Sequence, residues 1–175
     1  IISRGYKRKT SGMIILSDKD DFRTVGDEPI QYFKKFKNEV KVMVSENRVN
    51  ALNVNETDKI DVNILDDAYQ QRLVKPDMNI LLSSIKRPFY NDYIFPVGML
   101  REYRKNANRA DFLIFSGCDK EMKETERDEV ILKAKQYLNI NTPILFSHVR
   151  YDEPKKVFGN KFHKEVIAIS SIAYP

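Results

Sequence analysis

The chain has 175 residues, 42% of them hydrophobic, so it is long and apolar enough to bury a core and is not an intrinsically disordered chain. Thirty Lys and Arg residues against 25 Asp and Glu give a net charge of +5, which favours anionic partners such as phosphates, acidic lipid surfaces or nucleic acid. The single cysteine, Cys118, excludes an internal disulfide, and no apolar run approaches the roughly 20 residues of a membrane-spanning helix.

Both ends of the chain resemble interrupted strands. It begins with Ile1-Ile2-Ser3, which is typical of the end of a strand, and it closes on the apolar run 166–171 with almost nothing after it. Natural chains rarely start and finish inside sheet elements. We therefore expect residues 1–175 to form a single α/β domain that is a fragment of a longer protein.

Residues 3–9 form a cation-rich turn that contains Gly5 and Tyr6. An aromatic ring among cations can hold a sugar or a base while the charges hold phosphate. A solvated basic loop is the simpler explanation of the same composition. A short strand is predicted at 13–16, followed by a charged hairpin or loop over 17–23.

A helix is predicted from residue 28 to about residue 36, where apolar residues recur on one helical face. Asp27 is a suitable N-cap for this helix, and Glu28 and Pro29 suit its first turn. Alternatively, Asp27 is a carboxylate that activates a hydroxyl nucleophile. The residue pattern does not decide between these two roles.

A strand over 40–44 leads into a helix that we expect to run from Ser45, as its cap, to about Asn55. Arg48 lies in the first turn of that helix, where the helix dipole disfavours a cation. This conflict indicates an anion-binding role for Arg48. A surface salt bridge is the structural alternative.

The centre of the chain is an apolar run, residues 60–65, that predicts a buried strand and stops on Asp66 and Asp67. Carboxylates at the carboxyl end of a strand lie where α/β sheets bind ligands, and P-loop NTPases place a magnesium-binding Asp in this way. The same pair is also typical of a simple turn. The Gln-Gln-Arg run at 70–72 can bond substrate or phosphate oxygens and therefore favours the functional interpretation.

The second half of the chain alternates short strands with a long loop and a helix. Strands are predicted at 78–83, 111–115, 144–146 and 166–169, and an amphipathic, charged helix at 121–138. The loop at 86–104 mixes arginines with aromatic residues, which suits phosphate or saccharide recognition. Cys118 is interpreted as a packed thiol at a strand end, and no His/Cys grouping has metal-ligand spacing.

Strands that alternate with helices or long connections predict a mainly parallel, doubly wound α/β sheet. From residue 144 onward we expect an antiparallel hairpin arm through 152–159, near the C-terminus. No Gly-rich phosphate loop of the form Gly-x-x-x-x-Gly-Lys-Ser/Thr occurs in the chain. Its absence argues against a complete NTPase within these 175 residues.

Seven short motifs occur in one order over nearly the whole chain. They are Ser3-Arg4-Gly5-Tyr6, Gly26-Asp27-Glu28-Pro29, Leu65-Asp66-Asp67-Ala68-Tyr69-Gln70-Gln71-Arg72, Asn79-Ile80-Leu81-Leu82, Arg87-Pro88-Phe89, Pro96-Val97-Gly98-Met99-Leu100-Arg101-Glu102 and Arg109-Ala110-Asp111. In this order they resemble the tetraacyldisaccharide 4′-kinase family, the lipid A 4′-kinases of Gram-negative bacteria. Several motifs in family order are a stronger signal than any one of them.

The resemblance implies a sheet of P-loop NTPase type. It implies a kinase that uses ATP and Mg²⁺ to phosphorylate the 4′-hydroxyl of a tetraacyldisaccharide 1-phosphate at the cytoplasmic face of the inner membrane. In that family the phosphate-binding loop precedes the Ser-Arg-Gly-Tyr segment, and a second lobe follows the strand matched by 166–171. We therefore expect this chain to be the central portion of such an enzyme and to be inactive alone.

By motif, Asp27 corresponds to the carboxylate that assists the attacking hydroxyl, and Asp66 and Asp67 to the magnesium-associated acids. The expected disaccharide or phosphate contacts are Tyr6, Glu28, Arg48, Gln70 and Arg101. Two positions depart from the family pattern. Gln71 replaces the usual His, which removes a titratable imidazole, and Ser116-Gly117 replaces Thr-Lys, which removes a cation.

Two other interpretations stay open. A non-catalytic basic module would bind nucleic acid or anionic membrane through the 86–104 loop with steep salt dependence. Such a module does not need two adjacent acids at a strand end, so we expect no nucleic-acid partner. A descendant of the kinase that has lost activity is compatible with Gln71 and Gly117. Under the kinase interpretation an anionic membrane surface is an expected partner.

Overall fold

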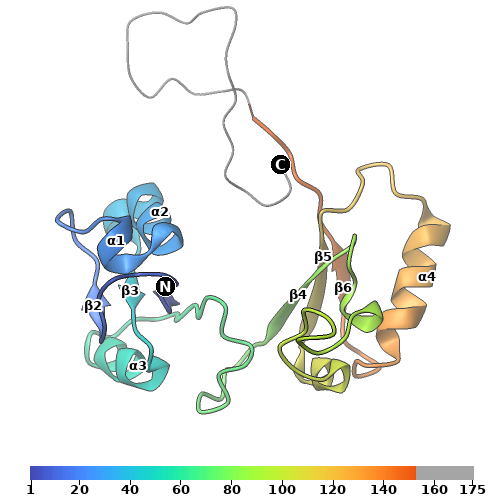
Figure 1. Cartoon of the computed structure of the whole chain (residues 1–175), viewed down its shortest axis with the longest axis horizontal. Helices are drawn as coiled ribbons and strands as arrows, with labels where there is room; N and C mark the ends of the chain where they lie inside the picture. Colours follow the sequence, from blue (N-terminus) through green and yellow to red (C-terminus); the bar gives the residue numbers. More distant parts are fainter. Residues whose placement is uncertain (153–175) are drawn as a thin grey trace, which may run out of the picture.

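The predicted strands form two separate three-stranded sheets, not one continuous doubly wound sheet (Figure 1). The computed structural model describes residues 1–152. The strand expected at 166–169 and nearly all of the hairpin expected through 152–159 lie outside the described residues. Each sheet has its own helices, and the segment between about residue 59 and residue 79 connects the two units (Figure 1). Within the described residues, no helix is both long and apolar enough to span a membrane.

The first sheet has the order β1-β3-β2 and is mixed. β1 (Ile2–Ser3) pairs with β3 (Met43–Val44) in parallel, and β2 (Ile14–Ile15) pairs with β3 antiparallel. Successive residues of a strand face opposite sides of a sheet. Val44 accordingly packs with Val25 and Ile30, whereas Met43 packs with Ile2 and Ala51 on the other side.

Helices cover both faces of this small sheet. α1 (Phe22–Val25), α2 (Asp27–Phe36) and the 3₁₀ turn η1 (Lys37–Glu39) lie on one side, and α3 (Arg48–Thr57) lies on the other (Figure 1). The strands expected at 13–16 and 40–44 and the helices expected in this half are therefore confirmed, with strands shorter than predicted.

Neither Asp27, considered as a possible cap, nor Ser45, expected as the cap of its helix, is an N-cap in the structure. The N-cap of α2 is Gly26, and Asp27 is the first helical residue; among residues 1–152, its carboxylate accepts a hydrogen bond only from the adjacent Glu28 N, at 3.0 Å. The N-cap of α3 is Asn47, whose Oδ1 accepts from two backbone amides at 3.1 and 3.3 Å, while the Ser45 hydroxyl donates to Asn47 O. A side chain caps only when its own backbone is extended and the chain has not yet turned.

The buried strand predicted at 60–65 does not form. Residues 60–64 lie outside regular structure, Val62 is 72% exposed, and only Leu65 forms an isolated parallel bridge, to Ile2. A strand needs a paired neighbour along its length, and β1 offers only two residues. The segment still runs parallel to β1 at its end, so Asp66 lies where the predicted strand would have placed it.

The second sheet is parallel throughout, with the order β4-β5-β6. Its strands are β4 (Ile80–Ser84), β5 (Phe112–Ser116) and β6 (Ile144–Phe146), which confirms the three strands predicted in this half. β6 pairs with β5 in parallel, and the later strand with which it would form the expected antiparallel arm lies outside the described residues. α4 (Glu124–Lys135) is the predicted charged helix, and the 86–104 loop contains η2 (Phe89–Asn91) and leads into η3 (Arg104–Arg109).

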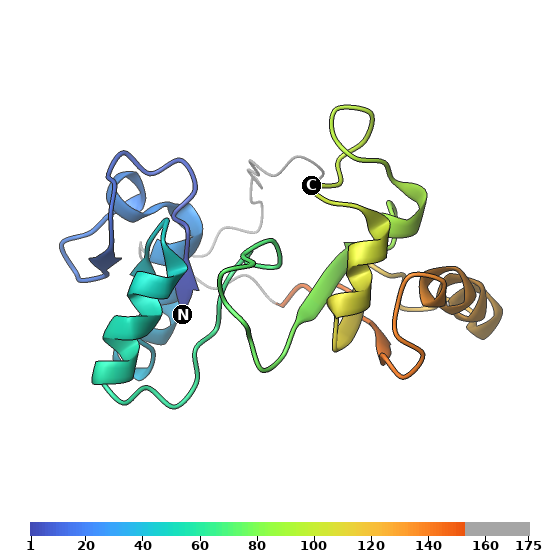
Figure 2. The same ribbon diagram turned by 90° about the horizontal axis from the view of Figure 1, so that it is seen from below.

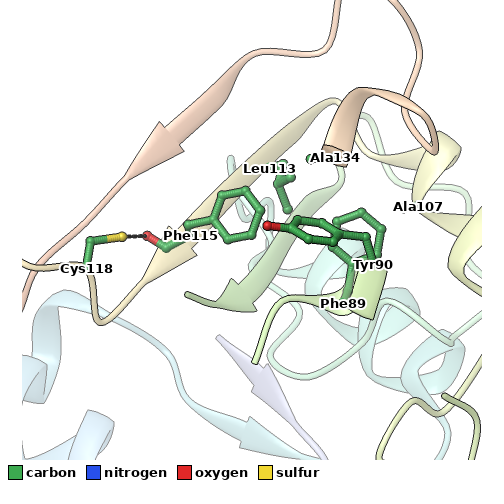
Figure 3. Packing of buried hydrophobic residues seen from close by; sticks show 7 residues of the cluster. All are labelled: Phe89, Tyr90, Ala107, Leu113, Phe115, Cys118 and Ala134. Carbon is green, nitrogen blue, oxygen red and sulfur yellow. Dashed lines mark hydrogen bonds between the residues drawn. The ribbon is translucent and has the colours of Figure 1, made fainter. Parts of the chain in front are cut away.

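One face of the second sheet carries its core. Phe89, Tyr90, Leu113, Phe115 and Ala134 are buried together, so η2, β5 and α4 share one apolar cluster (Figure 3). Cys118 lies at its edge, buried, with its thiol 3.4 Å from Phe115 O, which confirms the packed thiol. The opposite face exposes Leu82 and Leu145, which lie in one cross-strand row. Within the described residues this sheet is therefore covered on one face only.

The chain turn at Gly26 requires glycine. Its φ of 95° and ψ of 161° lie in a region that is essentially restricted to glycine, and an added Cβ would lie 3.2 Å from Gly5 Cα and from Tyr6 O. We expect Gly26→Ala to lower the free energy of unfolding by about 2 kcal/mol or more. Gly12→Ala is the matched control, because Gly12 has a φ of 81° but open space around it, and should lose only about 1 kcal/mol. Equal losses in urea denaturation of the two variants would contradict the close-packing argument.

Candidate active site

The Asp66–Asp67 turn starts where the chain leaves its pairing with β1. Ile2 N donates to Ile64 O at 2.8 Å, and Asp66 N donates to Ile2 O at 2.9 Å, so the backbone before the acids is held as in a parallel sheet. Asp66 Oδ2 is buried and has no hydrogen-bond partner in the described structure. Asp67 has a φ of 46°, in the left-handed region that non-glycine residues seldom occupy and that is often found at functional sites.

Asp27 and Glu28 lie at the start of α2, close to the same turn. The pKa of the Glu28 carboxyl is raised above its ordinary value, first by partial burial and then by the charges of Asp66, Asp27 and Asp67. The pKa of the nearby Tyr32 hydroxyl is raised by burial and by Asp66 and Glu28. Carboxylates from two separate motifs therefore gather in one place, as expected of a ligand site.

Arg48 approaches the acids from the start of α3, and within the part of the chain that the structure describes it forms no surface salt bridge. Its side chain is only 2% exposed, and its Nη1 donates to Ser45 O, while its Nε is buried without a partner in the described structure. Burial lowers the pKa of the guanidinium, as does the nearby Arg4, while Asp66 and Asp67 act in the opposite direction. A buried arginine with free donor capacity is suited to an anion.

Arg101 reaches the acid pair from the second unit. Its Nη1 donates to both carboxylate oxygens of Asp67, at 2.8 and 2.6 Å, and both side chains are largely exposed. Asp67 raises the pKa of Arg101, with a smaller contribution in the same direction from Tyr6. Tyr6 is itself exposed, and its loop passes against Gly26 just before Asp27.

Gln70 is less engaged than the other predicted residues. It lies exposed in the turn that follows the acids, and its side chain makes no hydrogen bond within residues 1–152. The structure thus brings the carboxylates of Asp27, Glu28, Asp66 and Asp67 near Arg48 and Arg101, with Tyr6 at the edge, and leaves Gln70 beside them.

Sequence reasoning missed a second set of polar residues behind the acid turn. Glu102 accepts hydrogen bonds from Arg72, Asn106 and Arg109, and Arg109 stacks on the ring of Tyr69. Glu102 and Arg109 both fall inside motifs that were recognised, but nothing in their spacing indicates that they meet each other and residue 72.

The residues fit a magnesium ion held with few protein ligands. Within the described residues no group of three or more His, Cys, Asp or Glu side chains has a metal-holding geometry. Mg²⁺ typically needs only one or two carboxylates, with waters and phosphate oxygens completing its coordination. The unpartnered, buried Asp66 Oδ2 is an acceptor that a cation would satisfy.

The raised pKa of Glu28 gives a stability prediction with a definite sign. Because its folded-state pKa is above the ordinary value, ionised Glu28 opposes folding at neutral pH, and this penalty disappears as the pH falls below its unfolded-state pKa. Glu28→Gln should therefore stabilise the chain at pH 7, by less than about 1 kcal/mol since the group is largely solvated, and have no such effect near pH 4. Urea denaturation at both pH values measures this, with the exposed Glu121→Gln as control. Destabilisation at pH 7 would show that the carboxylates do not repel one another.

Comparison with known proteins agrees with the motifs. The family model described as tetraacyldisaccharide-1-P 4′-kinase matches residues 1–175. The chain is 39% identical over 153 residues to the tetraacyldisaccharide 4′-kinase of Flavobacterium johnsoniae, covering 86% of this chain and 44% of that protein. It is 37% identical to the Bacteroides fragilis (strain ATCC 25285) protein and 34% identical to that of Parabacteroides distasonis, each time over all of this chain and 50% of the relative.

The chain thus spans about half the length of the curated relatives that it matches. No solved structure gives a significant match. The resemblance inferred from seven motifs is confirmed, and the chain belongs to the tetraacyldisaccharide-1-P 4′-kinase family.

Proposed function

We propose that this chain is the central part of a longer kinase that transfers phosphate from ATP to the 4′-hydroxyl of a tetraacyldisaccharide 1-phosphate in lipid A biosynthesis. The observation that carries the proposal is the meeting of Asp66 and Asp67 with Arg48 and Arg101, beside Glu28 and its chain neighbour Asp27, since these residues come from separate segments of the chain. Phosphoryl transfer depends on positioning and charge neutralisation, which is what such a mixed-charge cluster supplies.

The roles follow from the chemistry of each group. Asp27 has an exposed carboxylate at the start of α2 and would accept the proton of the attacking hydroxyl. Asp66 and Asp67 would hold Mg²⁺, which neutralises charge on the transferred phosphoryl group. Buried Arg48 and exposed Arg101 would bind phosphate oxygens of the substrates.

The remaining contacts would be made by neutral or acidic groups. Tyr6 and Gln70 are exposed beside the acids and can bond or stack on the sugar rings, and Glu28 can accept from sugar hydroxyls. We propose that the ATP phosphates are held by a P-loop outside these residues, within a sheet of P-loop NTPase type. The 175-residue chain should then have no kinase activity alone, so activity is tested in the longer protein.

An anionic membrane surface is the proposed partner beside the lipid substrate. The loop between η2 and η3, which Figure 2 shows projecting from the second unit, exposes Phe95 (73%), Val97 (82%) and Met99 (66%). Its base is held by the buried Asp92 carboxylate, which accepts from Met99 N at 3.2 Å. A fixed loop with an apolar tip and basic flanks suits insertion at the surface of an anionic bilayer. From the family, we propose that this surface is the cytoplasmic face of the inner membrane.

The assignment of Asp27 is tested by Asp27→Asn and Asp27→Ser in the longer protein. Because Gly26 is the cap of α2, neither change removes the helix cap, and the melting temperature should be nearly unchanged. Neither side chain accepts a proton near neutral pH, so kcat should fall by roughly 10²–10⁴-fold. Normal kcat in two folded variants would eliminate the general-base role.

The membrane surface is tested by co-sedimentation with vesicles of phosphatidylethanolamine and phosphatidylglycerol. Replacing both Phe95 and Val97 by Ser should weaken binding by at least about tenfold, because each side chain loses apolar burial worth about 1.5 kcal/mol or more. Ile140→Ser is the control, since Ile140 is 84% exposed but lies outside the loop. Equal effects of the loop and control variants would show that the loop does not contact lipid.

A further inference from the structure

Glu102 is the shared acceptor of a polar network behind the Asp66–Asp67 turn. Its carboxylate accepts from Arg109 Nη2 at 2.7 and 2.9 Å, from Arg72 Nη2 at 3.0 Å and from Asn106 Nδ2 at 2.9 Å. The side chain of Glu102 is 17% exposed and that of Arg109 31%. This is a half-buried, multiply bonded ion pair, which is stronger than an isolated surface pair.

Tyr69 connects this network to the acid turn. The Arg109 guanidinium carbon lies 4.4 Å from the centre of the Tyr69 ring, and Arg109 Nη1 donates to Tyr69 O at 3.1 Å. The Tyr69 hydroxyl donates to Asn106 O at 2.9 Å. Burial raises the pKa of Tyr69 to about 12, so this hydroxyl stays a hydrogen-bond donor at neutral pH. Tyr69 is thus fixed through three groups: its ring and its carbonyl oxygen contact Arg109, and its hydroxyl contacts Asn106.

The network therefore holds the far end of a turn whose near end is held by β1. Asp66 is fixed through its backbone to Ile2, and Tyr69, three residues later, is fixed to η3. Glu102 is also the neighbour of Arg101, which donates to Asp67. Glu102 thus connects two segments: the one that carries the acid pair, through Arg109 and Tyr69, and the one that carries Arg101, its neighbour in the chain.

We propose that Glu102 and Arg109 are positioning residues that hold the Asp66–Asp67 turn and Arg101 in register with each other. This proposal rests on the function proposed above, in which these three residues act on metal and phosphate. Neither Glu102 nor Arg109 has to touch substrate. Displacement of reacting groups by about 1 Å can cost on the order of 10²-fold in rate.

The first test is kinetic and uses the longer protein. Glu102→Gln keeps the size of the side chain but removes the charge that three donors share. We expect kcat to fall by roughly 10- to 100-fold, with KM for the lipid disaccharide changed less than about threefold, since binding in the ground state survives better than alignment in the transition state. Asp58→Asn, which breaks the remote Lys41–Asp58 ion pair, is the control and should leave kcat unchanged.

A double-mutant cycle separates positioning from general destabilisation. If Glu102 acts through the acid pair, its effect on kcat should largely vanish in an Asp67→Asn background, because residues that act as one unit are not additive. Additive losses, or a loss explained by a lower melting temperature alone, would overturn the proposal.

The second test does not depend on activity. Hydrogen exchange of the chain should show faster exchange at residues 66–71 in Glu102→Gln and in Arg109→Lys, where Asp66 N and Gln71 N are protected by backbone bonds. Exchange in β5 should be unaffected. Unchanged exchange at 66–71 would overturn the positioning role even if the kinase activity is confirmed, and faster exchange in a protein without kinase activity would overturn only the proposed function.

Discussion

The pairing of Ile2 with both Met43 and Leu65 is the constraint on which the candidate site depends. Ile2 is fully buried, and it pairs in parallel with β3 on one side and with Leu65 on the other. Parallel neighbours end at the same edge of a sheet, so the chain leaves all three segments on one side. The Tyr6 loop continues from β1, Arg48 comes shortly after β3, and the acid pair comes directly after Leu65. The site is thus a consequence of two short pairings that join three segments.

The acid pair illustrates what sequence patterns can and cannot predict. The apolar run before Asp66 predicted a buried strand, and most of that strand is absent because β1 is too short to pair with it. The position of Asp66 was nevertheless correct, since one bridge at Leu65 is enough to direct the chain. Local signals were reliable where the partner was long: β4, β5 and β6 follow their predicted ranges within about two residues and form a parallel sheet.

Features that depend on distant residues were not predictable from local patterns. Asp27 is of a residue type that is favoured at N-caps. The close approach of Gly26 to Gly5 nevertheless requires glycine at the turn, and Gly26 is therefore the cap. Arg48 conflicts with the helix dipole in sequence, and only the fold shows that it is buried near Asp66. The division into two sheets and the network around Glu102 join residues about 30 to 40 positions apart. The motif order nevertheless predicted residues that meet in the fold, because members of a family share the long-range contacts of one fold.

The distribution of charge at the site is more informative than the net charge of +5. Burial and then the nearby carboxylates of Asp66, Asp27 and Asp67 raise the pKa of Glu28, and Arg48 and Arg101 approach the same acid turn from different units. Acids and arginines that lie close together but are not locked in a buried ion pair can each give up their partner to a ligand that carries both charges. Asp67 illustrates this, since its exposed carboxylate is bound by Arg101, whose donors suit phosphate equally well. Under the proposed function, a magnesium–phosphate ligand would engage Asp67 and Arg101 together, and the geometry of the turn would decide whether both reach it at once.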